Sequence, residues 1–354
     1  MQDPTEFVKQ TSRELWIDAC KGIGILLVLL GHVSPPFMKF IYGFHMPLFF
    51  IISGYVFKKE NFQISFALYL KKLLKSYLFP YGILCFVNLF LEMGRNLILH
   101  IPDKADLLYH YLCGIIYSRG SQEWMPNCSP LWFLTGLIMA LLLFYAIGNR
   151  KSRKLQIIFI LFCPGISYIF YFMDAPKLFW NMDTALMAVL FISIGYRCKE
   201  ESLKFEKSKY CQSSTWYFFI IVLLIILGSV AIHLNPVEHV DFDDNIYGNL
   251  LCMICGALSI SLGLMILCFR TIKHWNQTLV KGICYLGRHT VFFMGFDYFS
   301  GSVARQLLSV AGLYPSWYWV FGLKLVILLV GLFLWNAVME RIAANIPNAK
   351  YLRM

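Results

Sequence analysis

The sequence predicts an all-α protein, a polytopic membrane helix bundle of about ten transmembrane helices with cytoplasmic N- and C-termini. Hydrophobic residues make up 58% of the chain and charged residues only 14%, a composition typical of an integral membrane protein and not of a soluble enzyme. The apolar residues form repeated blocks of roughly twenty residues, the length with which a helix crosses a bilayer. Strands of an outer-membrane barrel are shorter and alternate in polarity, so the blocks argue against that class.

The basic residues set the expected orientation of the bundle. With the N-terminus in the cytoplasm, about three quarters of the 31 Lys and Arg residues fall in cytoplasmic segments, as the positive-inside rule describes. The net charge of +11 is therefore interpreted as a topology signal next to membrane lipids, and no nucleic-acid partner is expected. We expect one domain over 1–354, with cytoplasmic ends at 1–14 and 339–354. The ten expected spans are 15–36, 41–57, 76–98, 131–149, 155–172, 181–197, 215–234, 247–269, 283–300 and 317–338.

The first span carries polar groups where they are costly. Asp18 and Lys21 lie near its start, and His32 follows Lys21 by eleven residues. Eleven helical residues rise about 16 Å and complete nearly three turns, so Lys21 and His32 fall on almost the same face. An ionisable group inside a membrane helix is a functional-site hypothesis, because its desolvation must be offset. The structural alternatives are a His that hydrogen-bonds a neighbouring helix and a Lys that snorkels to the interface.

The junction of the first two spans favours a pocket between them. Small residues in span 15–36 let a neighbouring helix approach closely, and Ser34-Pro35-Pro36 ends the span. Span 41–57 is short and starts irregularly at His45, just before Pro47. Irregular backbone in a membrane is tolerated where protein covers it or where it lines a cavity.

A basic segment, 58–75, lies between the second and third spans. Its last three lysines, Lys71, Lys72 and Lys75, fall within about one helical turn. They suit anionic lipid headgroups and, equally, the phosphates of a cytoplasmic donor.

Segment 99–130 is the longest expected loop on the opposite side of the membrane, and loops of this length are often lids or binding loops. Its aromatic and carboxylate residues, Glu123 among them, suit a sugar, although charged loop residues are usually only solvated. Cys113 and Cys128 could pair there. Trp132 opens the next span, where an interface anchor is the commoner interpretation.

Span 283–300 contains Arg288 and His289 near its start and Asp297 deep in the apolar run. Arg288 suits a cytoplasmic interface, whereas Asp297 is a second functional-site hypothesis. The acidic loop 235–246 lacks the glycine and terminal glutamate of a calcium loop. Because the cysteines also lack metal-site spacing, we expect no metal.

Together, Asp18, Lys21, His32 and the block 44–54 (FHMPLFFIISG) resemble the membrane-bound acyltransferase family 3. The family signature is a basic residue, ten residues and then a His in the first span. The block is similar to that of fucose 4-O-acetylase-like members, which modify bacterial surface polysaccharides. Further blocks that resemble the family are Lys72 and Lys75 before Pro80, residues 131–134 and residues 285–288.

This resemblance implies transfer of an acetyl group from acetyl-CoA to a hydroxyl of a cell-surface polysaccharide or its lipid-linked sugar precursor, in the inner (cytoplasmic) membrane. It is compatible with a homo-oligomer. An imidazole acts near neutral pH as a base or as an acyl carrier. The implied catalytic residues are His32, Lys21, Asp18 and His45; the implied acetyl-CoA-binding residues are Lys72, Lys75, Lys71 and Arg13; the implied acceptor-binding residues are Ser53, Trp132, Asp297 and Glu123.

A hypothesis from another class is a proton-coupled transporter or a flippase for a small anion or a lipid-linked sugar. Buried His and Asp residues suit proton-coupled transport equally well. Against it, the sequence shows no inverted repeat and no matched pair of broken helices. Consumption of a thioester would separate the two classes.

Overall fold

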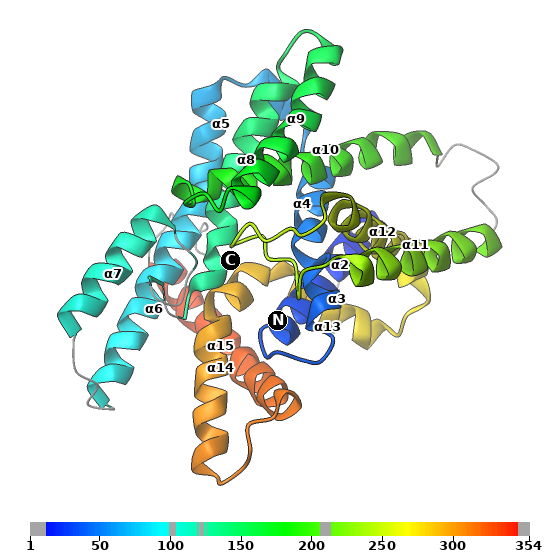
Figure 1. The fold of residues 1–354 in the computed structure, drawn as a ribbon. Helices are drawn as coiled ribbons and strands as arrows, with labels where there is room; N and C mark the ends of the chain where they lie inside the picture. The colour runs from blue at the N-terminus through cyan, green and yellow to red at the C-terminus, as the bar shows by residue number, and fades with distance from the viewer. Residues whose placement is uncertain are drawn as a thin grey trace. The chain divides into compact units, whose positions relative to one another are not determined.

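The computed structural model describes residues 12–98, 104–118, 120, 124–125, 127–205 and 214–345, and these residues are almost entirely helical (Figure 1). They contain no β-strand, and their one isolated β-bridge joins Asp241 and Ile246. The chain divides into two compact units. Unit 1 comprises 1–28, 36–72 and 136–288, and unit 2 comprises 29–35, 73–135 and 289–354.

Unit 1 contains the larger set of helices. It begins with most of α2 (Ser12–Gly31), a helix whose last residues belong to unit 2. Capping side chains start two of its helices: Ser152 accepts the Leu155 amide before α9 (Arg153–Phe172), and Asn249 accepts the Cys252 amide before α12 (Leu250–Thr271). The remaining helices are α3 (Met38–Tyr42), α4 (His45–Val56), η1 (Lys59–Gln63), α5 (Phe66–Leu73), most of α8 (Trp132–Gly148), η4 (Phe179–Asn181), α10 (Met182–Phe205), α11 (Ser214–Leu234), η6 (Ile272–His274) and α13 (Gln277–Arg288).

Helices α4 and α10 of unit 1 touch through two glycines. A Cβ atom built on Gly54 would lie 2.0 Å from the carbonyl oxygen of Ile192, and one on Gly195 would lie 1.9 Å from that of Ile51. Only glycine leaves the room for this backbone-to-backbone contact, which is the way small residues pack membrane helices. Helices α11 and α12 form another adjacent pair (Figure 1).

Unit 2 contains a turn from α2, the helices around the expected outer loop and the C-terminal helix pair. Its elements are η2 (Leu74–Leu78), α6 (Phe79–Ile98), α7 (Lys104–Tyr117), η3 (Ser129–Leu131), α14 (Thr290–Val310) and α15 (Trp317–Asn345). Helices α14 and α15 run side by side (Figure 1). Part of the core of this unit is the cluster Val33, Ala304, Leu308 and Val320.

Eight helices among the described residues are long and apolar enough to cross a membrane, fewer than the ten spans expected. The expected spans 15–36 and 283–300 are not among them, and both carry several ionisable residues. Span 283–300 was also wrong as one continuous helix. α13 ends at Arg288 and α14 begins at Thr290, because His289 between them has a non-helical backbone (φ −109°, ψ 25°).

Two further boundaries differ from the prediction. The expected loop 99–130 contains the helix α7. The third span lies in a longer helical stretch, Phe66–Ile98, with a π-helical turn at Leu74–Leu78 just before Pro80. A proline cannot donate to the preceding turn and its ring crowds that turn, so a wider turn accommodates it.

The pairing that the sequence left open for Cys113 and Cys128 does not form. Cys113 and Cys128 are both free thiols. Cys128 Sγ lies 3.0 Å from the hydroxyl of Tyr111, and both side chains are buried. The side of the membrane on which each end of the chain lies stays a prediction.

Candidate functional site

His32 and Asp297 form a hydrogen-bonded pair within unit 2. His32 follows the end of α2, and Asp297 lies on α14. The imidazole Nδ1 contacts Asp297 Oδ2, and the side chains are 11% and 0% exposed, respectively. Asp297 was expected to bind the acceptor, which stays a prediction; the structure brings its carboxylate to the proposed catalytic histidine.

The end of α2 sets the position of His32. Ser34 adopts a left-handed conformation (φ 55°) and two prolines follow it, so the helix cannot continue, as the sequence predicted. The amide of Val33, which would bond to Leu29 C=O in a continuing helix, bonds to Leu30 C=O instead (3.2 Å). The carbonyl of Leu29 is therefore left for another donor.

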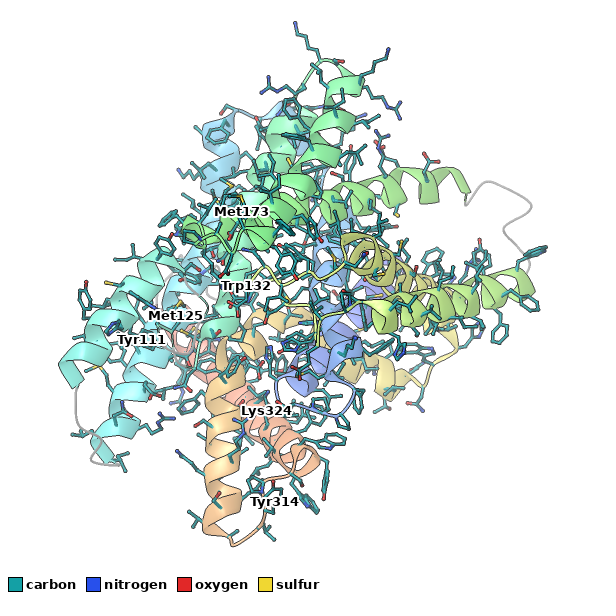
Figure 2. The ribbon with its side chains drawn as sticks, in the orientation of Figure 1. Tyr111, Met125, Trp132, Met173, Tyr314 and Lys324 are labelled. Carbon is teal, nitrogen blue, oxygen red and sulfur yellow. The ribbon has the colours of Figure 1, made fainter. Side chains whose placement is uncertain are left out.

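Lys324 of α15 supplies that donor. Its ammonium group donates to Leu29 C=O (3.0 Å) and forms an ion pair with Asp297 Oδ1. The side chain is only 1% exposed, and Figure 2 labels it beside the α14–α15 pair. Lys324 was not predicted, although an isolated lysine in an apolar span is the same signal that identified Asp297.

Tyr298 also packs next to the imidazole of His32. Its ring centroid lies 5.0 Å from that of His32, at an interplanar angle of 31°. When Nδ1–H donates to a carboxylate, the lone pair of the imidazole lies on Nε2. The same orienting contact fixes the histidine of a Ser-His-Asp triad, so the arrangement suits a general base or a nucleophile.

The other proposed catalytic residues lie in unit 1. Asp18 accepts a hydrogen bond from Arg288 Nε (2.9 Å), and Lys21 is partly buried on α2. His45 is buried at the start of α4, where its Nδ1 contacts Ile41 C=O (2.9 Å). Their proposed roles towards His32 stay predictions.

The proposed donor-binding lysines are exposed side chains. Lys71 and Lys72 belong to unit 1 and Lys75 to unit 2. Lys72 Nζ donates to Asn61 Oδ1 (2.7 Å), which directs its ammonium group towards η1. Arg13 falls in the first turn of α2, but its side chain lies outside the described part of the chain.

Unit 1 also has an open cavity of about 490 Å³ next to η1. Lys199 donates to Phe57 C=O (3.1 Å), and Arg197 pairs loosely with Glu200 (3.4 Å). The charged residues that line the cavity are Lys59, Arg153, Arg197, Lys199, Glu200 and Glu201.

The proposed acceptor-binding residues are spread over the chain. The Ser53 hydroxyl donates to Phe49 C=O of its own helix (2.7 Å), a common structural use of a helical serine. Trp132 is buried at the start of α8 in unit 2. Glu123 lies outside the described residues. Within the described residues, no three side chains are grouped as a metal site would need.

A second buried polar cluster in unit 2 was not predicted. Glu92 of α6 accepts hydrogen bonds from Arg95 Nη2 (2.5 Å) and from Asn127, and Arg95 Nη1 donates to Ser302 of α14 (3.0 Å). The cluster therefore ties the segment before Trp132 to two helices. A Glu and an Arg three residues apart in an apolar span were the available signal.

Lys177 contacts two carboxylates of the acidic loop in unit 1. Its ammonium lies 3.3 Å from Asp243 and 2.7 Å from Asp244. Burial raises the pKa of Asp243 to about 7 even with Lys177 nearby. The Asp241 carboxylate accepts the Asp243 amide (2.8 Å), so the loop is held by its own side chains.

Comparison with known proteins adds to this geometry. A family model described as "Acyltransferase domain" matches residues 14–335. Two proteins named "Nodulation protein NolL" are each 39% identical to part of the chain: that of Sinorhizobium fredii over 16% of this chain and 19% of its own length, and that of Mesorhizobium japonicum over 16% and 18%. The chain thus matches about a fifth of the length of these curated relatives. No solved structure matches.

Proposed function

The chain belongs to this acyltransferase family, and we propose from that premise that it moves an acetyl group from acetyl-CoA to a sugar hydroxyl, with His32 at the reacting centre. The observation that carries the proposal is the buried carboxylate of Asp297 on the imidazole of His32. A buried carboxylate is energetically costly in a membrane protein, so its presence favours a functional site. The eight apolar helices make the protein a multi-pass membrane protein.

The proposed chemistry needs no reagent beyond donor and acceptor. His32 Nε2 takes the proton of the acceptor hydroxyl as its oxygen attacks the thioester carbonyl. The C–O bond forms, the C–S bond breaks, and the thiolate of CoA leaves and receives the proton from the imidazolium. In the alternative order, Nε2 attacks the thioester first and carries the acetyl group to the hydroxyl. Asp297 serves both routes, because it orients the ring and stabilises the imidazolium.

The remaining assignments extend the proposal to both substrates. Lys72 and Lys75, helped by Lys71 and Arg13, would bind the CoA phosphates as point charges. Lys21 and Asp18 would place the thioester or neutralise the developing charge, and His45 would orient His32 or hold the acceptor. Trp132, Glu123 and Ser53 would contact the acceptor, a cell-surface polysaccharide or its lipid-linked precursor at the inner (cytoplasmic) membrane. The motif resemblance over 13–57 and 72–80 supports these assignments.

The test is acetyl transfer in proteoliposomes with radiolabelled acetyl-CoA and a panel of sugar acceptors. We expect label on a sugar with the unmodified protein and none with His32→Ala. His274→Ala is the matched control, because His274 is an exposed histidine outside the site, and it should transfer at the normal rate. Full activity of a folded His32→Ala protein would refute the assignment of His32.

Proton-coupled transport is the second candidate. The observation in its favour is that His32, Asp297 and Lys324 are ionisable groups in contact inside a membrane protein. Uptake of a sugar or an anion driven by a pH gradient, without release of CoA, would favour transport over transfer.

A further inference from the structure

Lys324 contacts both the end of the helix that carries His32 and the carboxylate that binds it. We infer that Lys324 is a positioning residue for His32, holding the imidazole and Asp297 in register and balancing the charge of the carboxylate that the ring meets. The inference rests on the proposed role of His32 as base or acyl carrier.

The contacts of Lys324 place it between the backbone that carries His32 and Asp297. Leu29 C=O lies three residues before His32, and Lys324 bonds to it at 3.0 Å while pairing with Asp297. One ammonium group thereby connects α15 to the last turn of α2 and to α14. Ammonium donors suit the carboxyl end of a helix, where free carbonyls and the helix dipole are negative. The contact fixes the distance between the backbone that carries His32 and the carboxylate that the ring meets.

The charges of Asp297 and Lys324 balance each other inside the site. Asp297 and Lys324 are 0% and 1% exposed, so water screens neither charge. With Lys324 present, the charges of the carboxylate and the ammonium cancel. Without Lys324, the buried carboxylate would lose its counter-charge, and the imidazole would no longer meet a carboxylate held in place by a neutral pair.

Among the described residues, Lys324 is the lysine or arginine that forms an ion pair with Asp297. Tyr298 packs on the imidazole ring, and Arg305 is an exposed residue two turns after Asp297 on α14. Val33 next to His32, Val320 one turn before Lys324 and Ala304 two turns after Asp297 belong to one buried apolar cluster. Apolar walls strengthen each charge interaction inside them.

A purely structural role would also explain a lysine that joins three helices, so the test needs readouts that packing alone does not move. The variants are Lys324→Met, which removes the charge; Lys324→Gln, which keeps hydrogen-bonding capacity without charge; and Lys324→Arg, which keeps the charge. Arg305→Met is the matched control, because it removes a nearby cation that the structure does not place on Asp297. Each protein is purified at full length in detergent and checked for a single size-exclusion peak and for its thermal unfolding temperature.

The first readout is the downfield proton signal of an imidazole N–H bound to a carboxylate, recorded by NMR without donor or acceptor and assigned by its loss in His32→Gln. We expect the signal in the unmodified protein, Lys324→Arg and Arg305→Met, and its loss or a large shift in Lys324→Met and Lys324→Gln. The second readout is acetyl transfer. We expect kcat to fall on the order of 10- to 100-fold in Lys324→Met and Lys324→Gln, with unchanged KM values, and to stay within about fivefold of normal in Lys324→Arg.

The outcomes separate this inference from the proposed function. An unchanged imidazole signal and an unchanged kcat in folded Lys324→Met would overturn it, and Lys324 would be a structural link alone. Should Lys324→Met not fold, the comparison of Lys324→Gln with Lys324→Arg decides, and equal signals and rates in these two would overturn the inference. Absence of transfer by the unmodified protein would instead overturn the proposed function, while the imidazole signal would still test the contact itself.

Discussion

Asp297 accepts a hydrogen bond from His32 although 265 positions separate the two residues in the sequence. Both belong to unit 2, so the pairing is a property of one compact part of the protein. It joins the end of α2 to α14, a helix near the end of the chain. The carboxylate is fully buried, and it contacts the imidazole of His32 and the ammonium of Lys324.

Replacement of this carboxylate should abolish most of the transfer. We expect Asp297→Asn to lower kcat on the order of 10²- to 10⁴-fold, because the amide can present its N–H to the ring and stabilise the wrong tautomer. KM for acetyl-CoA should change little. The measurement is the initial rate of label transfer in proteoliposomes, with Asp174→Asn as a control at an exposed aspartate. Normal kcat in a folded Asp297→Asn protein would show that the pair is not used in the reaction.

The Glu92 cluster should contribute to stability and not to chemistry. Glu92→Ala leaves the Arg95 guanidinium and the Asn127 amide without their acceptor. We expect a loss of about 2–3 kcal/mol, less than for a fully buried pair because the Arg95 side chain is 25% exposed. The measurement is thermal unfolding in detergent, together with the double variant Glu92→Ala and Arg95→Met. The double variant should recover part of the loss; strict additivity of the two single changes would argue against a coupled pair.

Much of the fold was predictable because membrane helices have a strong local signal. The end of α2 followed from Ser34-Pro35-Pro36, and His32 was identified as an ionisable residue in an apolar block. The break at His289 has no proline beside it and lies two residues after Gly287, and a single glycine in an apolar run is a weak signal for dividing a span. The helix α7 was missed because its polar residues resemble those of a loop.

The site was only partly predictable, since partners between distant segments leave no local pattern. His32 and Asp297 were each identified as buried ionisable residues, but nothing in the sequence shows that they meet. Lys324 could have been identified as a lone lysine in span 317–338, but its partners, Asp297 and Leu29 C=O, are visible only in the structure. Asn127 joins Glu92 from a segment that the sequence treats as loop.

The glycine contact between α4 and α10 should tolerate no side chain. We expect Gly54→Ala and Gly195→Ala each to destabilise the protein by about 1–3 kcal/mol, because the added methyl group would meet a backbone carbonyl that cannot rotate away. Gly165→Ala is the matched control. A Cβ atom there meets nothing within 4 Å in helix α9, so it should be neutral or stabilise by up to about 1 kcal/mol. Thermal unfolding in detergent measures all three, and equal unfolding temperatures would show that α4 and α10 can separate at no cost.

The acidic loop should make stability depend on pH through Asp243. Its folded-state pKa is raised to about 7 by burial, above the ordinary value of 3.8, so between these values the folded state holds a proton that the unfolded state has released. Stability from this group is therefore complete at low pH and is lost as pH rises from about 4 through about 7. The pKa of Lys177 is net raised: burial lowers it, but the Asp243 and Asp244 carboxylates outweigh burial. This cation stays charged across that window and adds no slope of its own.

Asp243→Asn isolates the effect, because the amide keeps the shape of the protonated carboxyl but cannot ionise. We expect the unfolding temperature of the unmodified protein to fall relative to that of Asp243→Asn as pH rises from 5 to 8, and the difference to level off once Asp243 is ionised. Asp174→Asn at an exposed position serves as the control and should follow the unmodified protein. If the unfolding temperatures of Asp243→Asn and the unmodified protein change in parallel with pH, Asp243 is already ionised at pH 5. The attraction of Lys177 for the Asp243 carboxylate would then outweigh the cost of burying that carboxylate.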